Sequence, residues 1–349
     1  MSNKRIYFAF PGDLDAASGG YHYGRRIIAE LRELGLVVEL VALPHCNFPL
    51  TEDTRFQVVQ ALAKIPDHAT IIIDGLAYGV LDEVAAAEAE RLLLIALCHH
   101  PLALETGHSE REQQLLFESE RRALGYARLI LVTSDHTRQI LINQFAMAPE
   151  TVIVARPGTD RVDFAACEGN PPQLLTLASL TRRKAHDVLI EALARLSALS
   201  WQARFVGSTA FDPDWAIQLQ EQAARLGLAE RIDFAGEVDD AQAEYQRADM
   251  FVLPSRYEGY GMVFAEAIAA GLPIVGASGG AVPEVVPPSA GLLVPPDDAD
   301  ALADALHRLL NGDAVREGLQ TGARSAAASL PQWADSASIV AKALREVQR

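Results

Sequence analysis

The sequence predicts an α/β fold built from two doubly wound parallel sheets, each the centre of its own domain. Short apolar runs typical of buried strands alternate with helical stretches in both halves of the chain, which indicates parallel sheets. The 349 residues, half of them hydrophobic, exceed one ordinary compact core and suit two domains. Residues 163–173 are rich in turn formers and lack periodicity, so we place the domain boundary there.

Composition excludes several function classes. The net charge of −16 argues against a nucleic-acid partner and against adsorption of the whole surface to anionic lipid, although a local patch could still contact a membrane. Cys46, Cys98 and Cys167 lie far apart and match no disulfide framework or metal-ligand spacing, which favours a reducing compartment. No signal-peptide pattern and no apolar run of about 18 residues is visible, so we expect a cytoplasmic protein.

The N-terminal domain, expected over residues 1–165, carries six short apolar runs. The expected strands are residues 5–10, 37–43, 70–74, 92–97, 129–133 and 151–155, and the clearest helices are residues 21–34, 109–124 and 136–144. In open parallel sheets ligands bind beyond the carboxyl ends of the strands. The residues that follow each strand are therefore the candidates for a binding site.

A glycine pair follows the first expected strand. Gly19 and Gly20 open a helix, so their amides could meet a phosphate group, and a flexible turn is the alternative. The loop does not match the G-x-G-x-x-G fingerprint, and no stretch matches a P-loop. Both absences argue against a dinucleotide-dependent dehydrogenase and a P-loop nucleotidase.

Two histidines follow the fourth expected strand. Because His99 and His100 stand at a strand end, either could hydrogen-bond a ligand hydroxyl, and ordinary loop histidines are the alternative. A metal site is not expected, because adjacent residues in an extended loop point apart and no third ligand is evident. His99 is the preferred candidate and His100 remains its rival, while Glu105 a little further on is either a ligand contact or a solvated charge.

The C-terminal domain, expected over residues 173–330, begins with a basic turn. Its expected strands are residues 174–178, 202–207, 231–235 and 250–253, and its expected helices are residues 185–196, 214–226, 298–310 and 313–328, followed by a final amphipathic helix at 333–347. Arg182, Arg183 and Lys184 precede a helix start, where cations oppose the helix dipole. An anionic ligand such as a diphosphate would explain this conflict, and a solvated basic turn is the alternative.

Residues 254–273 combine a strand end, a glycine loop and a helix. The stretch reads PSRYEGYGMVFAEAIAAGLP, and its expected helix, residues 262–270, stops at Gly271. Free amides at the helix start and small loop residues suit phosphate oxygens. The carboxylates of Glu258 and Glu266 suit hydroxyl groups instead, so the stretch predicts a site for a nucleotide-sugar. A solvated pair of glutamates around an ordinary turn is the alternative.

These residues also carry a family resemblance. Two glutamates separated by seven residues, EGYGMVFAE from Glu258 to Glu266, resemble the signature of retaining glycosyltransferases of family 4. The flanks PSRYEGYG and AEAIAAGLPIV, and the later GGAVPEVV and GLLVPPDDADALADAL, are similar to that family too. The resemblance covers the C-terminal half and parts of the N-terminal half. It implies the GT-B fold, in which two Rossmann-like domains face one another across a cleft and a final helix, here 333–349, packs back on the N-terminal domain.

The resemblance also implies an activity and a set of site residues. The expected reaction moves a hexose from a UDP- or GDP-sugar to an acceptor hydroxyl, with an α-glycosidic bond, retention, no metal and no cofactor. The acceptor is a glycan, a lipid-linked molecule or a small molecule. The implied catalytic residues are Glu258, His99, Arg183 and Lys184; the implied donor contacts are Gly19, Gly20, Arg182, Val238, Gly259, Tyr260, Gly261, Met262, Val263 and Glu266; the implied acceptor contacts are His100 and Glu105.

One departure from the family pattern leaves an alternative open. The family's diphosphate-binding arginine often lies in a Gly-Arg-Leu-like triplet, which here reads Ala178-Ser179-Leu180. Arg183 or Arg182 is therefore the substitute, and the sequence does not choose between them. A nucleotide-sugar epimerase or a phosphorylase of the same fold, or an inactive nucleotide-sugar-binding partner, are the other functions considered. Peripheral membrane contact is common in the family, but no basic amphipathic helix compels it.

Overall fold

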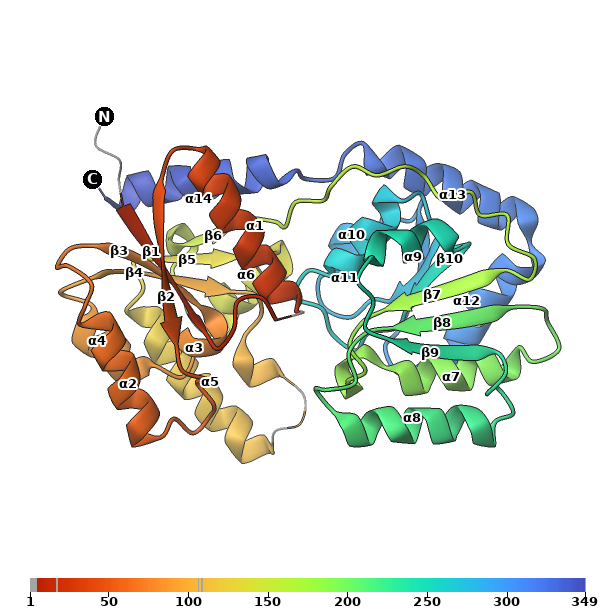
Figure 1. Cartoon of the computed structure of the whole chain (residues 1–349), viewed down its shortest axis with the longest axis horizontal. Coiled ribbons are helices and arrows are strands. Elements are labelled where there is room, and N and C mark those ends of the chain that lie inside the picture. Colours follow the sequence, from red (N-terminus) through yellow and green to blue (C-terminus); the bar gives the residue numbers. More distant parts are fainter. Residues whose placement is uncertain (1–4, 17, 106, 108, 349) are drawn as a thin grey trace. The chain divides into compact units, whose positions relative to one another are not determined.

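The structure is a computed structural model that describes residues 5–16, 18–105, 107 and 109–348. The chain divides into two compact units, Met1–Gly158 together with Pro331–Arg349, and Thr159–Leu330. Figure 1 shows the elements of both units, coloured along the chain.

The first unit contains a six-stranded sheet in the order β2-β1-β3-β4-β5-β6, with every pairing parallel. Its strands are β1 (Arg5–Pro11), β2 (Val37–Leu43), β3 (Thr70–Asp74), β4 (Leu93–Cys98), β5 (Leu129–Val132) and β6 (Val152–Val154). Its helices are α1 (Gly19–Glu33), α2 (Glu52–Leu62), α3 (Gly75–Tyr78), α4 (Asp82–Glu88), α5 (Glu110–Gly125), α6 (Asp135–Asn143) and α14 (Trp333–Val347), with 3₁₀ turns η1 (Leu102–Leu104) and η2 (Pro149–Thr151).

The second unit repeats this design with a six-stranded parallel sheet in the order β12-β11-β10-β7-β8-β9. Its strands are β7 (Gln173–Leu177), β8 (Gln202–Val206), β9 (Ile232–Gly236), β10 (Met250–Leu253), β11 (Ile274–Ala277) and β12 (Gly291–Val294). Its helices are α7 (His186–Arg195), α8 (Pro213–Arg225), α9 (Ala241–Arg247), α10 (Met262–Ala269), α11 (Val282–Val285), α12 (Ala299–Asn311) and α13 (Asp313–Ala327), preceded by the 3₁₀ turn η3 (Arg182–Lys184).

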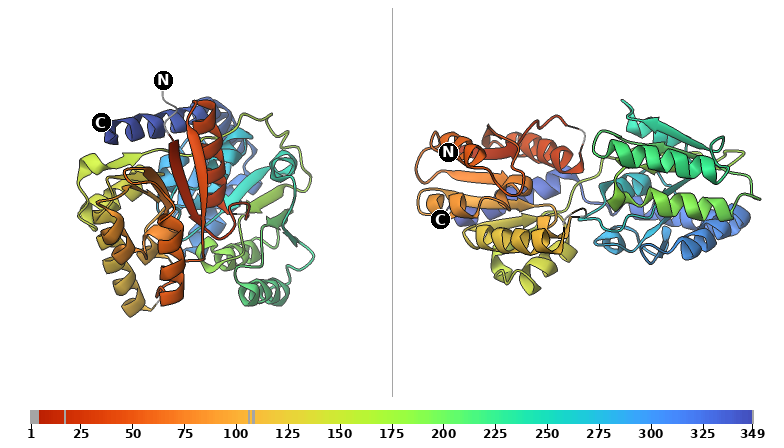
Figure 2. Two further views of the ribbon diagram at one scale, coloured as in Figure 1. Left: turned by 60° about the vertical axis from the view of Figure 1, so that its left-hand side comes forward. Right: turned by 90° about the horizontal axis from the view of Figure 1, so that it is seen from below.

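Helices cover both faces of each sheet (Figure 2). This explains why the central strands are apolar along their length, since a central parallel strand is buried on both sides. Every residue of β3, β10 and β11 is buried. The prediction of two Rossmann-like parallel α/β units is confirmed.

The last helix belongs to the first unit. The buried face of α14 carries Trp333, Ala337, Val340 and Leu344. The Trp333 ring lies 5.9 Å from the Tyr23 ring of α1. A β-carbon on Gly158 would lie 2.2 Å from the Trp333 nitrogen, so only glycine allows the chain and the helix start to approach this closely.

The structure differs from the sequence interpretation at the junction between the units. The first unit ends at Gly158 and the second begins at Thr159, whereas turn-rich composition places the boundary within residues 163–173. The reason is that Ala165 is fully buried in the second unit, where its N–H donates to the Ala270 carbonyl at 2.8 Å. The structure adds β11 and β12, of four residues each, to the strands expected from the sequence.

Candidate functional site

The candidate site of the second unit lies where its sheet changes direction. The chain runs from β7 outward to β8 and β9, then returns to place β10 on the other side of β7. The connections after the neighbouring strands β7 and β10 therefore run in opposite directions across the sheet. In parallel sheets, ligands bind beside the loops at such a switch point. The first loop carries η3, and the second carries Glu258.

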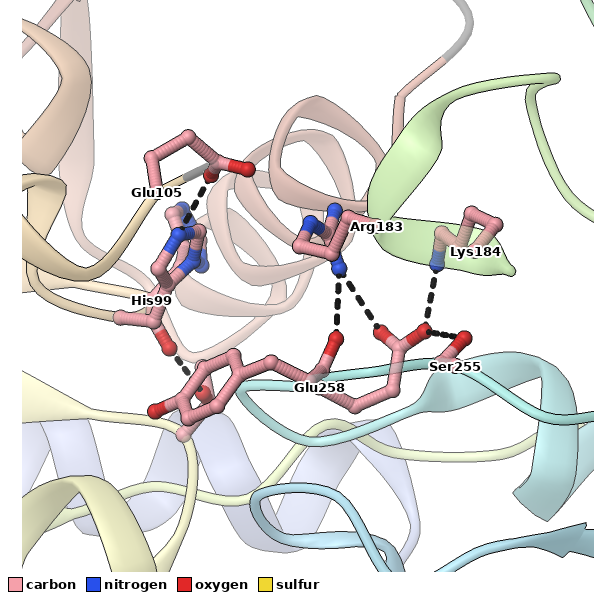
Figure 3. A network of polar contacts seen from close by, with 9 residues as sticks. His99, Glu105, Arg183, Lys184, Ser255 and Glu258 are labelled. Atoms are coloured by element: carbon pink, nitrogen blue, oxygen red, sulfur yellow. Dashed lines mark hydrogen bonds and ion pairs between the residues drawn. The ribbon is translucent and has the colours of Figure 1, made fainter. Parts of the chain in front are cut away.

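A buried polar network joins these two loops (Figure 3). The Lys184 Nζ donates to Glu258 Oε1 at 2.6 Å, and the Ser255 hydroxyl donates to the same oxygen at 2.6 Å. The Arg183 Nη1 lies 3.4 Å from Glu258 Oε2. The Glu258 side chain is only 7% exposed, so the carboxylate and its two cations form a largely buried cluster.

Electrostatics hold Glu258 in its ionised form. Burial by itself raises the pKa of this carboxyl, but Lys184 and Arg183, together with the hydrogen bonds from Lys184 and Ser255, more than offset it. The net result lowers the pKa of Glu258 from 4.5 to about 2. Because the group stays charged, it can only accept hydrogen bonds, as the binding of ligand hydroxyls requires.

The two arginines that the sequence leaves open make different contacts in the structure. Arg183 also donates to the Tyr257 carbonyl at 2.9 Å and is part of the Glu258 cluster. Arg182 instead stacks on the Trp215 ring, 4.2 Å from its centroid, and lies 3.8 Å from an Asp212 oxygen. The geometry therefore brings Arg183, and not Arg182, to Glu258.

The helix α10 begins directly after the Glu258 loop. Gly261 precedes it with φ of +92°, where a side chain would be strained, and no side chain caps the first turn. Met262 and Val263 are partly buried in that turn, and Gly259 is partly buried in the loop. Tyr260 is 6% exposed and packs in the core of the second unit.

Glu266 lies about one turn into α10 and has its own partner. Its Oε2 accepts a hydrogen bond from the Tyr245 hydroxyl of α9 at 2.8 Å. Burial raises the pKa of Glu266, the Tyr245 hydrogen bond acts against this, and Asp160 adds to the rise. Val238, the remaining predicted donor contact in this unit, follows β9 and packs at the edge of the same core.

The first unit gathers predicted residues at the carboxyl ends of β1, β3 and β4. His99 Nε2 lies 3.2 Å from Asp74 Oδ2, and the Tyr23 ring meets the imidazole edge-on at 5.5 Å. A β-carbon on Gly20 would lie 3.3 Å from the His99 ring, so Gly20 and His99 are neighbours. No atom of the described residues lies within 4 Å of the corresponding position on Gly19.

Asp74 is a residue that the sequence interpretation missed. It is 2% exposed, and its other oxygen accepts from the Leu76 N–H at 2.9 Å. The carboxylate therefore orients the His99 ring and favours the tautomer with a proton on Nε2. The available signal is an acid that closes the apolar strand TIIID at a carboxyl end.

His100 points to a different partner from His99. Its Nε2 lies 2.6 Å from Glu105 Oε2. The two predicted acceptor contacts therefore pair with each other, while His99 pairs with Asp74. Adjacent histidines with separate partners agree with the expectation that neighbouring side chains in this loop point apart.

The 3₁₀ turn η1, which follows the two histidines, contacts a buried carboxyl group. Glu120 of α5 is 2% exposed, and its Oε2 lies 3.4 Å from the Ala103 N–H in η1. Burial raises the pKa of Glu120 from 4.5 to about 7, against the hydrogen bonds from the Leu102 and Ala103 amides. This acid therefore gains its charge near neutral pH.

We expect Glu120→Gln to stabilise the protein in alkaline solution only. A folded-state pKa above the unfolded value gives a stability contribution that is present below pH 4.5 and is lost as the pH rises through 7. Glutamine keeps the acceptor oxygen without the charge, so at pH 8 the variant gains up to about 3 kcal/mol. Chemical denaturation at pH 5 and pH 8 checks this, and an equal effect at both would contradict the buried-acid account.

The part of the chain that the structure describes contains neither a metal-ligand cluster nor a membrane-spanning helix. No cluster of three or more histidine, cysteine, aspartate or glutamate side chains there is placed to hold a metal ion. Among these same residues, no helix combines the length and apolar character needed to cross a bilayer.

Comparison with protein families gives one match. Residues 171–312 match the family model described as glycosyl transferases group 1. This segment contains the basic turn, Glu258, Glu266 and Tyr245, which are the polar residues of the second unit's site.

Curated relatives cover more of the chain at low identity. The lipopolysaccharide core biosynthesis mannosyltransferase LpsB of Rhizobium meliloti is 30% identical over 54% of this chain and 58% of its own length. An MMP alpha-(1->4)-mannosyltransferase of Mycolicibacterium hassiacum is 27% identical over 73% and 66%. A D-inositol 3-phosphate glycosyltransferase of Salinispora arenicola is 32% identical over 61% and 52%. The chain thus spans less than two thirds of these relatives' lengths.

Solved structures match the fold along nearly the whole chain. A sucrose-phosphate synthase from Thermosynechococcus elongatus has a TM-score of 0.81 at 22% identity, covering 98% of this chain and 99% of that one. Anabaena Alr3699/HepE in complex with UDP-glucose has a TM-score of 0.78 at 18% identity, covering 98% and 100%. At these identities the likeness shows the fold.

Proposed function

We propose that this chain, whose residues 171–312 match the family model of group 1 glycosyl transferases, transfers a hexose from a UDP- or GDP-sugar to an acceptor hydroxyl. The observation that carries the proposal is the buried Lys184–Glu258–Arg183 cluster at the point where the second sheet changes direction. Such a cluster offers cations to a diphosphate and a charged acceptor to sugar hydroxyls on adjacent loops.

Each side chain has a role that its contacts support. Glu258 Oε1 accepts from Lys184 and Ser255, and Oε2 lies 3.4 Å from Arg183 Nη1. Oε2 therefore keeps capacity for a donor-sugar hydroxyl. Lys184, Arg183 and the uncapped amides of α10 stabilise the negative charge that develops on the departing diphosphate.

We assign retention of configuration and an α-glycosidic bond on the family resemblance. The acceptor oxygen bonds to the anomeric carbon as the bond from that carbon to the diphosphate oxygen breaks. The acceptor proton passes to the leaving phosphate oxygen on the same face. This step requires no protein base and no metal, and the charge on the leaving group is met by Lys184 and Arg183.

The first unit is proposed to bind the acceptor. His99 is its predicted catalytic contact, held by Asp74, and the paired His100 and Glu105 are its predicted acceptor contacts. The acceptor classes remain a glycan, a lipid-linked molecule or a small molecule. A lipid-linked acceptor would bring the protein to the inner face of the membrane as a peripheral protein, and vesicle co-sedimentation tests that arrangement.

Glu266 is proposed to accept hydrogen bonds from the ribose of the donor. We expect Glu266→Gln to weaken UDP or GDP binding about tenfold, because a charged acceptor is lost. The same change should leave the melting temperature equal or higher, since burial raises the pKa of Glu266 and disfavours its charge. Calorimetric titration and thermal melting measure both effects, and Glu237→Gln, at an exposed loop position, is the control.

The activity is tested by release of nucleoside diphosphate. Purified protein is incubated with UDP- and GDP-hexoses, with and without acceptor panels of glycans, lipid-linked sugars and small alcohols. Acceptor-dependent release with an α-configured product, unchanged by EDTA, supports the proposal. Conversion of the donor sugar without acceptor would support the epimerase alternative, and binding without turnover would support an inactive nucleotide-sugar-binding protein.

A further inference from the structure

Arg256 lies between the basic turn and the Glu258 loop and contacts both. It follows β10 by three residues, inside the glutamate loop. Its backbone N–H donates to the Arg183 carbonyl at 2.8 Å, and its Nη1 donates to the Arg182 carbonyl. The side chain is 25% exposed. One residue therefore ties two successive carbonyls of η3 to the loop that carries Glu258.

Each of the two loops donates hydrogen bonds to the other. While Arg256 donates to the carbonyls of Arg182 and Arg183, the Arg183 guanidinium donates to the Tyr257 carbonyl at 2.9 Å. The guanidinium of Arg256 thus donates to the backbone of the basic turn, and the guanidinium of Arg183 donates to the backbone of the glutamate loop. These contacts join the two loops at the positions that precede Lys184 and Glu258.

The charge of Arg256 is already neutralised by carboxylates. Its Nη2 lies 2.8 Å from Asp187 Oδ2 at the start of α7, and its Nε lies 2.7 Å from Asp297 Oδ1. The Nη1 also lies 3.2 Å from Asp187 Oδ1. Nε, Nη1 and Nη2 of Arg256 thus each donate to an acceptor of the protein. Its guanidinium fork matches the Asp187 carboxylate with two parallel contacts.

We propose that Arg256 is a positioning residue for diphosphate binding: it holds the basic turn against the glutamate loop so that Lys184 and Arg183 meet the diphosphate beside Glu258. The inference rests on the proposed function, since it presumes a nucleoside diphosphate at this turn. It acts through the turn and makes no contact with the ligand itself. Nothing in the Glu258 signature requires an arginine here, since the residue precedes that signature by two positions.

The role predicts a loss that depends on the diphosphate. In Arg256→Met the aliphatic stem remains but every tie to Arg182, Asp187 and Asp297 is lost. We expect UDP or GDP, whichever the parent binds, to bind about 10- to 100-fold more weakly, as expected for misplaced binding groups. Binding of the matching monophosphate should change far less, because the contacts to the terminal phosphate are the ones displaced. The ratio of the two affinities is the readout.

Two variants guard against a folding defect. Arg256→Lys keeps the charge but cannot make the forked contact with Asp187 while reaching Asp297 and the Arg182 carbonyl, so an intermediate loss is expected. Asp187→Asn leaves Arg256 in place with a weaker partner and should show a smaller loss of the same kind. Arg231→Lys is the matched control, because Arg231 also donates to backbone carbonyls, those of Ser197, Leu199 and Trp201, before β9 begins.

The positioning role of Arg256 is tested by calorimetric titration of all variants with UDP, UMP, GDP and GMP, together with thermal melting. We expect the ratio of diphosphate affinity to monophosphate affinity to fall most in Arg256→Met, less in Arg256→Lys and least in Asp187→Asn. The ratio should stay unchanged in Arg231→Lys. If the parent binds a diphosphate and Arg256→Met and Arg256→Lys keep the parent's ratio, the positioning role is wrong while the proposed function stands. A parent that binds neither diphosphate overturns both.

Discussion

Lys184→Met is expected to weaken UDP or GDP binding about 100-fold and to lower the free energy of unfolding by roughly 3 kcal/mol. Lys184 donates to Glu258 at 2.6 Å, and the two side chains are 15% and 7% exposed. Methionine replaces the stem but leaves the buried carboxylate with one fewer cation. The ligand loses the charge proposed to meet its diphosphate, so stability and affinity fall together.

Calorimetric titration and chemical denaturation measure the two losses. Lys342→Met serves as the control, because Lys342 is an exposed residue of α14 in the first unit. That variant should match the parent in both measurements. A Lys184→Met protein that binds the diphosphate as tightly as the parent would remove the basic turn from the proposed site.

Glu258→Gln is expected to separate turnover from diphosphate binding. We expect release of nucleoside diphosphate from the donor sugar to fall about 10³-fold, because the charged acceptor for sugar hydroxyls is lost from a preorganised site. UDP or GDP alone lacks the sugar, so its affinity should hold or rise as Lys184 and Arg183 lose their competing carboxylate. Single-turnover kinetics and titration with the free diphosphate test the two halves.

The same variant checks the ionisation of Glu258. A pKa lowered from 4.5 to about 2 gives a stability contribution that is present above pH 4.5 and is lost as the pH falls toward 2. The destabilisation in Glu258→Gln relative to the parent should therefore shrink on acidification across that range. Denaturation curves at pH 7, 4 and 3 show the trend, and a difference independent of pH would mean that Glu258 is not held ionised by its cations.

Local sequence patterns predicted the elements of the second unit's site but not the contacts between those elements. The strand, glycine loop and helix around Glu258 follow from neighbouring residues in the sequence, and the structure has them as β10, the loop and α10. The contact between Lys184 and Glu258 joins residues 74 positions apart. It exists because β10 returns to pair with β7, and strand order is a property of the whole sheet that local patterns do not specify.

The same limit explains the residues that were missed or left open. The Arg182 side chain stacks on Trp215 of α8. Which of the two arginines contacts Glu258 therefore depends on packing between distant elements. Tyr245, the partner of Glu266, comes from α9, and Asp74, the partner of His99, closes a different strand. Each is a partner across the fold rather than a neighbour in the sequence.

We propose that the second unit binds a nucleoside diphosphate at the Lys184–Glu258–Arg183 cluster without a metal. The most direct measurement is a thermal-shift titration of the parent and Lys184→Met with UDP, GDP, ADP and TDP, with and without EDTA. A ligand that binds the folded state raises the melting temperature by mass action. We predict a concentration-dependent rise with one base, unchanged by EDTA and nearly abolished in Lys184→Met. No rise with any diphosphate in the parent, or an equal rise in both proteins, would contradict the account.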